Sequence, residues 1–318
     1  MTAQSSILPP FPFFPGNNVT PPPPLPPVGV NVAPPPPLPP VGANVAPPPP
    51  LPAPQPLSNT TPPPPPANSI QTTTGNDAII ADSQNNTIFG SGGNDTIDGS
   101  TGTDTLIYNL PQSITLLAGG VVNKGALGQD KINNIETIVG SPNQANTIDG
   151  STGTGVASLN INLSANSLAV NDLPTIGTLN FTVQNFVNAI GTPNIDSITG
   201  NDLNNALTAG AGSDTINAGG GDDAIIGVNP NDATPGSIEN DLLFGGFGRD
   251  LFVLGQSNKA FYTGAGGATI SDFEKGIDRI QLAGNISDYA ITGNSISRAG
   301  DLIATVNTGI GLADLLFV

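Results

Sequence analysis

The chain has 318 residues, of which 40 are glycine and 34 are proline, and its formal net charge is −17. It contains no cysteine, histidine or tryptophan, which excludes disulfides, thiol chemistry, imidazole catalysis and zinc sites built from cysteine and histidine. With only 7 basic residues, nucleic acid and anionic membrane surfaces are poor partners, whereas a cation is a natural one.

Residues 1–73 carry no charged side chain and are rich in proline. The run Pro21-Pro22-Pro23-Pro24-Leu25-Pro26-Pro27-Val28-Gly29 recurs from Pro34 and, less regularly, from Pro47. Proline fixes φ and lacks an amide donor, so neither helix nor sheet is expected. The tract is predicted to be a disordered or polyproline II stalk, and a passive low-complexity spacer is the alternative. No N-terminal secretory signal is expected from it, because no basic residue precedes its apolar positions.

A nine-residue period begins in residues 74–107, where an Asp or Asn is followed two places later by an apolar residue. Such a period predicts a parallel β-solenoid, in which each repeat is a glycine-rich turn followed by a short strand. The repeat positions are Asp77, Asn86, Asp95 and Asp104, with Ile79, Ile88, Ile97 and Leu106 as the apolar partners.

Residues 108–193 lack these turns but keep strand patterns such as Leu159-Asn160-Ile161-Asn162-Leu163. The run 134–143 resembles the run 185–194. We therefore predict wider, metal-free solenoid coils that repeat about every fifty residues, acting as a structural spacer. A ligand groove along this face is the alternative.

The period of nine returns in residues 194–253 and ends on the sequence Gly245-Gly246-Phe247-Gly248-Arg249-Asp250-Leu251-Phe252-Val253. Two prolines within 227–240 indicate that this stretch loops out of the coil. If it does, Asp223 and Asp241 become neighbours along the coil. The repeat positions are Asp196, Asn205, Asp214, Asp223, Asp232, Asp241 and Asp250.

Turns on one side of such a coil are eighteen residues apart and stack at about the ~4.8 Å strand spacing. Calcium prefers six to eight oxygen ligands, so an ion between two stacked turns would take two carboxylates and several carbonyls. Asn86 and Asn205 supply a neutral oxygen and predict weaker sites. The alternative is that these turns are only good turn formers in a metal-free coil. The predicted pairs are Asp77–Asp95, Asn86–Asp104, Asp196–Asp214, Asn205–Asp223, Asp223–Asp241 and Asp232–Asp250.

The two arrays resemble the RTX, or hemolysin-type, calcium-binding repeats, including those of secreted cyanobacterial proteins. This resemblance implies an all-β fold, a parallel β-roll with Ca²⁺ as cofactor. Residues 254–318 are predicted to form a C-terminal β cap, and 268–282 resembles the segment that closes RTX arrays, so Asp272 or Asp278 is expected to hold a last ion. The predicted metal ligands are Asp77, Gly90, Gly93, Asp95, Gly99, Gly102, Asp104, Asp196, Gly210, Gly212, Asp214, Gly219, Gly221, Asp223, Asp241, Gly245, Gly246, Gly248, Asp250 and Asp278.

The last residues, Asp314-Leu315-Leu316-Phe317-Val318, are similar to the uncleaved signal of proteins that type I exporters secrete. A last strand of the cap is the alternative. The expected protein is therefore extracellular or bound to the cell surface, passes through a type I exporter, and folds on binding calcium.

Its expected role is structural or interactive, with calcium ions and a surface polysaccharide or protein as partners. No membrane insertion is expected, because no apolar run reaches the ~18 residues of a membrane helix. No enzyme is expected, because the sequence lacks H-E-x-x-H and G-x-S-x-G motifs. The alternatives are a carbohydrate-binding adhesin that uses the 108–193 face, or an accessory to a toxin or hydrolase.

Overall fold

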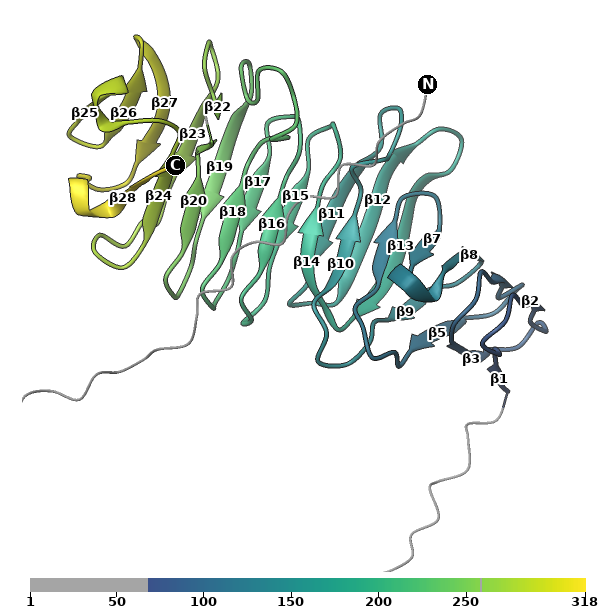
Figure 1. Cartoon of the computed structure of the whole chain (residues 1–318). Helices are drawn as coiled ribbons and strands as arrows, with labels where there is room; N and C mark the ends of the chain where they lie inside the picture. The colour runs from purple at the N-terminus through teal and green to yellow at the C-terminus, as the bar shows by residue number, and fades with distance from the viewer. Residues whose placement is uncertain (1–67, 258) are drawn as a thin grey trace, which may run out of the picture. The chain divides into compact units, whose positions relative to one another are not determined.

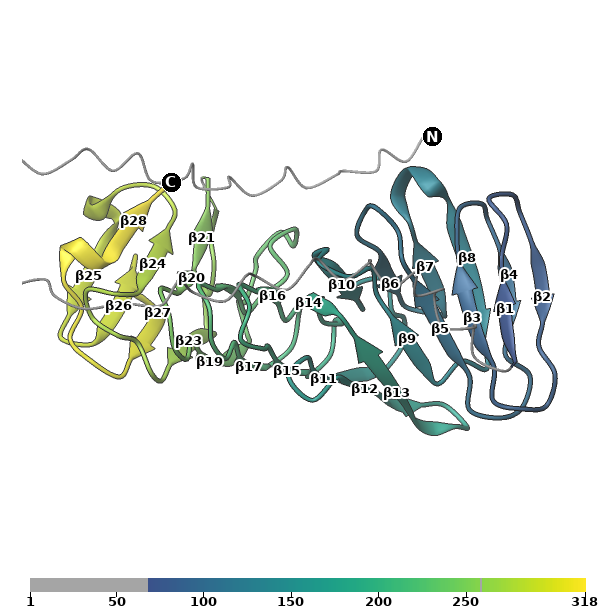
Figure 2. The same ribbon diagram turned by 90° about the horizontal axis from the view of Figure 1, so that it is seen from below.

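A computed structural model describes residues 68–257 and 259–318. The predicted proline-rich stalk, up to residue 67, lies outside these residues. The described chain forms two large sheets of short strands, and Figure 2 shows β11, β15, β17, β19 and β23 as one row with β10, β14, β16 and β20 as the facing row. The expected all-β fold is confirmed.

The first sheet has 14 strands, and its neighbours are hydrogen-bonded in this order: β1 (Ser69–Gln71), β3 (Thr87–Gly90), β5 (Thr105–Tyr108), β9 (Thr137–Val139), β13 (Gly177–Gln184), β12 (Ser167–Leu173), β11 (Ser158–Asn162), β15 (Ser197–Thr199), β17 (Thr215–Asn217), β19 (Asn240–Phe244), β23 (Gly267–Ile270), β27 (Asp301–Val306), β26 (Ser295–Arg298) and β25 (Tyr289–Thr292).

The second sheet has 12 strands, in this order: β2 (Ala78–Ile80), β4 (Thr96–Asp98), β8 (Gln129–Asn133), β7 (Val121–Asn123), β6 (Thr115–Leu117), β10 (Asn146–Asp149), β14 (Phe186–Ile190), β16 (Ala206–Thr208), β18 (Ala224–Ile226), β20 (Leu251–Val253), β24 (Arg279–Leu282) and β28 (Leu315–Phe317). Two short strands pair separately, β21 (Gly255–Gln256) and β22 (Lys259–Ala260), and three 3-10 turns complete the fold, η1 (Gly125–Leu127), η2 (Ile286–Asp288) and η3 (Leu312–Asp314).

The nine-residue period places successive strands alternately in the two sheets, as Figure 1 shows for β14 to β20. Stacked neighbours are therefore eighteen residues apart: Ile79 pairs in parallel with Ile97, and Ile198 with Ile216. The apolar residue of each repeat points between the sheets, where Ile97 and Ile216 are fully buried. The thin core is thus a stack of one apolar side chain per strand.

In the segment 108–193, for which the sequence predicts wider solenoid coils, some strands pair antiparallel. Strands β6, β7 and β8 pair antiparallel, and so do β11, β12 and β13. The outer strands of each triplet pair in parallel with the next strands of the sheet: β8 with β4 and β6 with β10, and β13 with β9 and β11 with β15. Alternation of apolar and polar residues identifies a strand but leaves its direction open, which is why hairpins were not foreseen.

The predicted internal repeat of this segment does not stack on itself. Thr137–Val139 lies in the first sheet, whereas the echoing residues within Phe186–Ile190 lie in the second. The two similar sequences therefore form strands in opposite sheets of the coil.

The predicted loop in the second array is confirmed, since no strand lies between β18 and β19. The register across it grows to 27 residues, so that Ile216 pairs with Leu243 and Ile225 with Phe252. Lys259 secures the loop by donating hydrogen bonds to the carbonyls of Pro230 and Asp232. The coil thus continues as if the loop were absent.

The C-terminal region closes the two sheets differently. The first sheet ends in the antiparallel strands β25, β26 and β27, and the second ends in β28, which pairs in parallel with β24. The Asp314 side chain is buried and accepts amide hydrogen bonds from Gly276 and Gly311. The last residues are therefore a strand of the cap. The described part of the chain has no helix with the length and hydropathy of a membrane span.

Candidate calcium sites

The acidic residues of the repeats form hydrogen-bonded ladders from coil to coil. The amide of Asp196 donates to Asp214 Oδ1 at 2.7 Å, and the amide of Asp214 donates to Asp241 Oδ1 at 2.8 Å. A second ladder runs from Asn205 through Asp223 to Asp250. One carboxylate oxygen of each acid is thus used by the backbone, and the other is left for a different partner.

Four of these aspartates have a second oxygen that is buried without any hydrogen-bond partner. These aspartates are Asp104, Asp214, Asp223 and Asp250. A buried carboxylate oxygen without a partner is costly, and a positively charged ligand removes that cost. These four oxygens are the structural feature that most directly indicates a cation.

The turn conformation explains why these oxygens have no partner. The residue four places before each of the four aspartates has a positive φ: 69° at Ser100, 115° at Gly210, 105° at Gly219 and 88° at Gly246. Where that residue is Thr73, Thr192 or Glu274, outside the positive-φ set, its amide instead donates to Asp77, Asp196 or Asp278. The left-handed residue, usually glycine, therefore turns the amide away and leaves the oxygen free.

At two of the four positions, the glycine five residues before the aspartate leaves room beside the carboxylate. A Cβ atom on Gly245 would lie 2.3 Å from Asp250 Oδ2, and one on Gly99 would lie 2.6 Å from Asp104 Oδ2. Any side chain at either position would occupy the space in front of the free oxygen. The glycines thus preserve a small space that an ion can enter.

Burial raises the pKa of the free carboxyls. It raises the pKa of Asp214 to about 8, with Asp241 adding like charge, and the pKa of Asp223 to about 7, with Asp250 adding like charge. Burial also raises the pKa of Asp250 to about 6, and that of Asp104. Without a cation the ionised carboxylates are therefore disfavoured in the fold.

The donor set fits calcium, a hard ion that binds carboxylate and carbonyl oxygens. Within residues 68–257 and 259–318, no three Asp or Glu side chains converge on one point. A calcium ion at one of the free oxygens would therefore have to take most of its other ligands from turn carbonyls.

The predicted pairs are found in the coil except across the loop. The amides of Asp77, Asn86, Asp196 and Asn205 donate to the acid eighteen residues later. The pairs Asp223–Asp241 and Asp232–Asp250 are wrong. Because residues 227–239 leave the coil, Asp214 stacks with Asp241 and Asp223 with Asp250, 27 residues apart. Asp232 lies in the loop and accepts a hydrogen bond from Asn229.

Several predicted ligands have their second oxygen occupied by the protein. Asp278, predicted as a possible ligand of a last ion, stacks under Asp250, and its carboxylate accepts the amides of both Asp250 and Glu274. Asp272 likewise accepts the amides of Gly245 and Gly246. Asp95 contacts Lys124, and Asp241 accepts a hydrogen bond from Tyr262.

The predicted glycines fall into three groups. Gly90 lies in strand β3, where a Cβ atom would be 2.3 Å from the Tyr108 ring, so it makes room for that ring rather than for a turn. Gly99 and Gly245 lie against a carboxylate as described. The remaining ones have positive φ: Gly93, Gly102, Gly210, Gly212, Gly219, Gly221, Gly246 and Gly248.

Two ladder residues were missed by the sequence analysis. Asp130 Oδ1 accepts the amide of Asp95 at 3.0 Å, and Glu136 Oε2 accepts the amide of Asp104 at 2.7 Å. The run Gly125-Ala126-Leu127-Gly128-Gln129-Asp130 is a degenerate repeat that could have identified Asp130. No comparable signal precedes Glu136.

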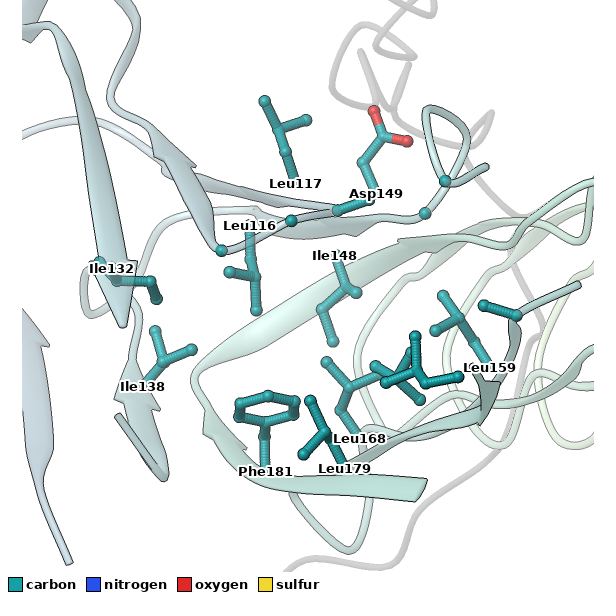
Figure 3. Close-up of a pocket in the computed structure, with 18 of the residues that line it drawn as sticks. Leu116, Leu117, Ile132, Ile138, Ile148, Asp149, Leu159, Leu168, Leu179 and Phe181 are labelled. Atoms are coloured by element: carbon teal, nitrogen blue, oxygen red, sulfur yellow. The ribbon is translucent and has the colours of Figure 1, made fainter. Parts of the chain in front are cut away.

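A cavity of about 650 Å³ lies between the sheets in the segment 108–193. Figure 3 shows Leu116 and Ile148 on one side of it and Leu168, Leu179 and Phe181 on the other. The strands that carry these side chains belong to the two antiparallel insertions and β10. This part of the coil is therefore wider and less tightly filled than the arrays.

Two family models match the chain. The RTX calcium-binding nonapeptide repeat matches residues 71–106 in four copies, and the C-terminal domain of serralysin, a peptidase of the M10 family, matches residues 179–303. No curated protein matches the chain. Among solved structures, the extracellular lipase LipA from Serratia marcescens is 15% identical with a TM-score of 0.28. The match covers 78% of this chain and 40% of the lipase, so the chain spans less than half of that protein.

Proposed function

We propose that this chain, an RTX calcium-binding repeat protein, is a secreted or surface-attached β-roll whose arrays fold when calcium binds. The observation that carries the proposal is the set of four buried aspartate oxygens without partners, at Asp104, Asp214, Asp223 and Asp250. At Asp104 and Asp250, a turn glycine also leaves space beside the free oxygen. The match to calcium-binding repeats over residues 71–106 supports the same ion.

In this proposal the four aspartates hold the ions together with carbonyls of their turns and of the stacked turns. Calcium, when bound, supplies the positive charge that neutralises the stacked carboxylates. The chain itself contributes the amide hydrogen bonds that fix each Oδ1, the left-handed turn residues that leave each Oδ2 free, and the apolar core beneath. The remaining predicted ligands, Asp77, Asp95, Asp196, Asp241 and Asp278, serve mainly to stack the coils.

The energetics of this switch support secretion before folding. Cytosolic calcium is scarce, so the carboxylates of the arrays would repel one another and oppose coiling inside the cell. Extracellular calcium-binding modules have dissociation constants of about 10⁻⁴–10⁻³ M, which suits calcium outside the cell. The serralysin C-terminal match supports export by a type I system.

A non-catalytic role is part of the proposal. The full sequence has no histidine or cysteine, which removes the commonest general base and a common nucleophile. The adhesin alternative has less support, because the cavity in the segment 108–193 is lined mainly by aliphatic side chains. Sugars are usually bound through hydrogen bonds and aromatic stacking, and Phe181 is the one aromatic residue among the described residues of that lining.

Equilibrium dialysis of the full chain against calcium tests the proposal, with magnesium as the control ion. We expect calcium to bind at one ion for each of the four aspartates with a free oxygen, and magnesium not to replace it, because magnesium demands a smaller octahedral site. A chain that binds no calcium at ~10 mM, a concentration well above the usual range for such modules, would contradict the proposal.

A further inference from the structure

The ladder carboxylates differ in what faces their second oxygen. At Asp104, Asp214, Asp223 and Asp250 nothing in the described protein does. At the stacked pair Asp95 and Asp130, a lysine does. Asp95 and Asp104 are equivalent positions of the nine-residue repeat, but the structure gives their second oxygens different surroundings.

Lys124 is fully buried, and its ammonium lies between the two stacked carboxylates. Its Nζ is 3.3 Å from Asp95 Oδ2 and within hydrogen-bonding distance of Asp130 Oδ1. Tyr108 completes the cluster by donating a hydrogen bond of 2.7 Å to Asp130 Oδ2. Among the described residues, Lys124 is the only lysine or arginine that is buried. All four carboxylate oxygens of the pair therefore have partners from the chain: the amides of Asp77 and Asp95, Lys124 and Tyr108.

The stacked carboxylates of Asp95 and Asp130 form a position in the ladder that suits a cation. The amide of Asp95 donates to Asp130 Oδ1, as in the arrays. Two buried carboxylates so close together require positive charge nearby. A lysine that is part of the chain provides this charge at any calcium concentration, and the surrounding carboxylates offset the cost of burying it.

The ladder is interrupted a second time before Asp241, and there too a side chain from outside the repeats faces the carboxylate. Asp241 follows the loop 227–239, and the fully buried Tyr262 hydroxyl donates to its Oδ2 at 2.5 Å. Both Lys124 and Tyr262 come from segments outside the nine-residue repeats. Where the repeat pattern is broken, a residue from outside the repeats therefore supplies the donor that faces the carboxylate.

We infer that the Lys124 ammonium takes the place of a calcium ion between Asp95 and Asp130, so that this position of the ladder binds no calcium. The inference rests on the proposed function, since it assumes that the equivalent positions of the arrays hold calcium. It makes the coil at Asp95 and Asp130 the one part of the first array whose charge is balanced by the chain itself.

The test is the number of calcium ions bound at saturation by the full chain, measured by equilibrium dialysis, with circular dichroism to establish folding. Asp95→Asn and Asp104→Asn are matched variants, because each keeps the Oδ1 atom that accepts an amide. We expect Asp104→Asn to bind one ion fewer and Asp95→Asn to bind as many as the wild type. Loss of an ion in Asp95→Asn would overturn the inference.

Lys124→Ala provides the converse test, with the exposed Lys131→Ala as its control. We expect Lys124→Ala to fold in calcium and to bind one ion more than the wild type, and Lys131→Ala to bind the same number. A Lys124→Ala chain that binds no additional ion, or that fails to fold in saturating calcium, would overturn the inference. Wild-type protein that binds no calcium, or an Asp104→Asn variant that loses none, would instead contradict the proposed function.

Discussion

The amide of Asp223 donates a hydrogen bond of 3.0 Å to Asp250 Oδ1, although the two residues are 27 positions apart in the chain. This bond joins two consecutive coils across a loop that leaves the repeat. It also fixes the Asp250 carboxylate so that Oδ2 is buried without a partner. The backbone thus holds the carboxylate in place before any ion arrives, and the ion completes the position.

Replacing Asp223 by Asn should remove one calcium site while leaving the ladder intact. The amide oxygen of Asn can still accept the hydrogen bond from the Asn205 amide. A site filled at ten times its dissociation constant contributes about 1.4 kcal/mol, so urea unfolding in calcium should show a loss of about that size. Asp222→Asn is the control, because Asp222 is exposed and also accepts one amide bond. Equal losses for both variants would refute the assignment of Asp223.

The glycine that turns the amide away should tolerate no side chain. Gly246 has a φ of 88°, and a Cβ atom there would lie 1.9 Å from the Gly219 carbonyl oxygen. Gly276 has a similar φ of 84° but open space around it. Gly276→Ala should therefore cost only the left-handed conformation, about 1–2 kcal/mol, and Gly246→Ala should cost clearly more. Denaturant unfolding in calcium measures both, and similar costs would be inconsistent with the stacking described.

The thin core predicts a large penalty for removing one of its aromatic side chains. Phe252 is fully buried, pairs with Ile225 and Ile280 in the neighbouring strands, and has its ring 6.1 Å from that of Phe273. Phe252→Ala should destabilise the calcium-bound protein by about 3–5 kcal/mol. Phe247→Ala, at a position that is 82% exposed, should change stability by less than about 0.5 kcal/mol. A small effect at Phe252 would mean that the coils do not depend on their core.

Acid should partly replace calcium. Burial raises the pKa of Asp214 to about 8 and that of Asp223 to about 7, from 3.8. The calcium-free fold therefore binds more protons than the unfolded chain, and the stability that these protons supply is lost as the pH rises from about 4 to about 8. In chelator, circular dichroism should show more β structure at pH 5 than at pH 8. The gain in β structure on adding calcium should be larger at pH 8 than at pH 5. A chelator spectrum that gains β structure with rising pH would contradict this sign.

The arrays were predictable because a period of nine fixes both the strand and the stacking partner. Ile79 and Ile97 pair where the spacing placed them, and the two prolines near Asp232 correctly indicated a loop. The length of that loop then set the pairing of Asp223 with Asp250, which a fixed spacing of eighteen had missed.

The interrupted parts of the ladder were not predictable in the same way. Lys124 reaches Asp95 from 29 residues away, through antiparallel strands whose direction the sequence pattern does not encode. Tyr262 reaches Asp241 from beyond β20 in the same manner. Such contacts depend on how an insertion folds back onto the coil, and no local spacing signals them. The free oxygens of Asp214, Asp223 and Asp250, by contrast, each follow a glycine four residues earlier, which the sequence shows, whereas at Asp104 that residue is Ser100.

The most direct test of the account is amide hydrogen exchange of the full chain in excess chelator and in ~5 mM calcium, above the usual dissociation constants of such modules. We predict that strands β17, β18 and β20, next to Asp214, Asp223 and Asp250, exchange rapidly in chelator and become strongly protected in calcium, with no such change in magnesium. Equal protection of these strands in chelator and in calcium would mean that the coil forms without the ion, and would contradict the proposal that calcium folds this protein.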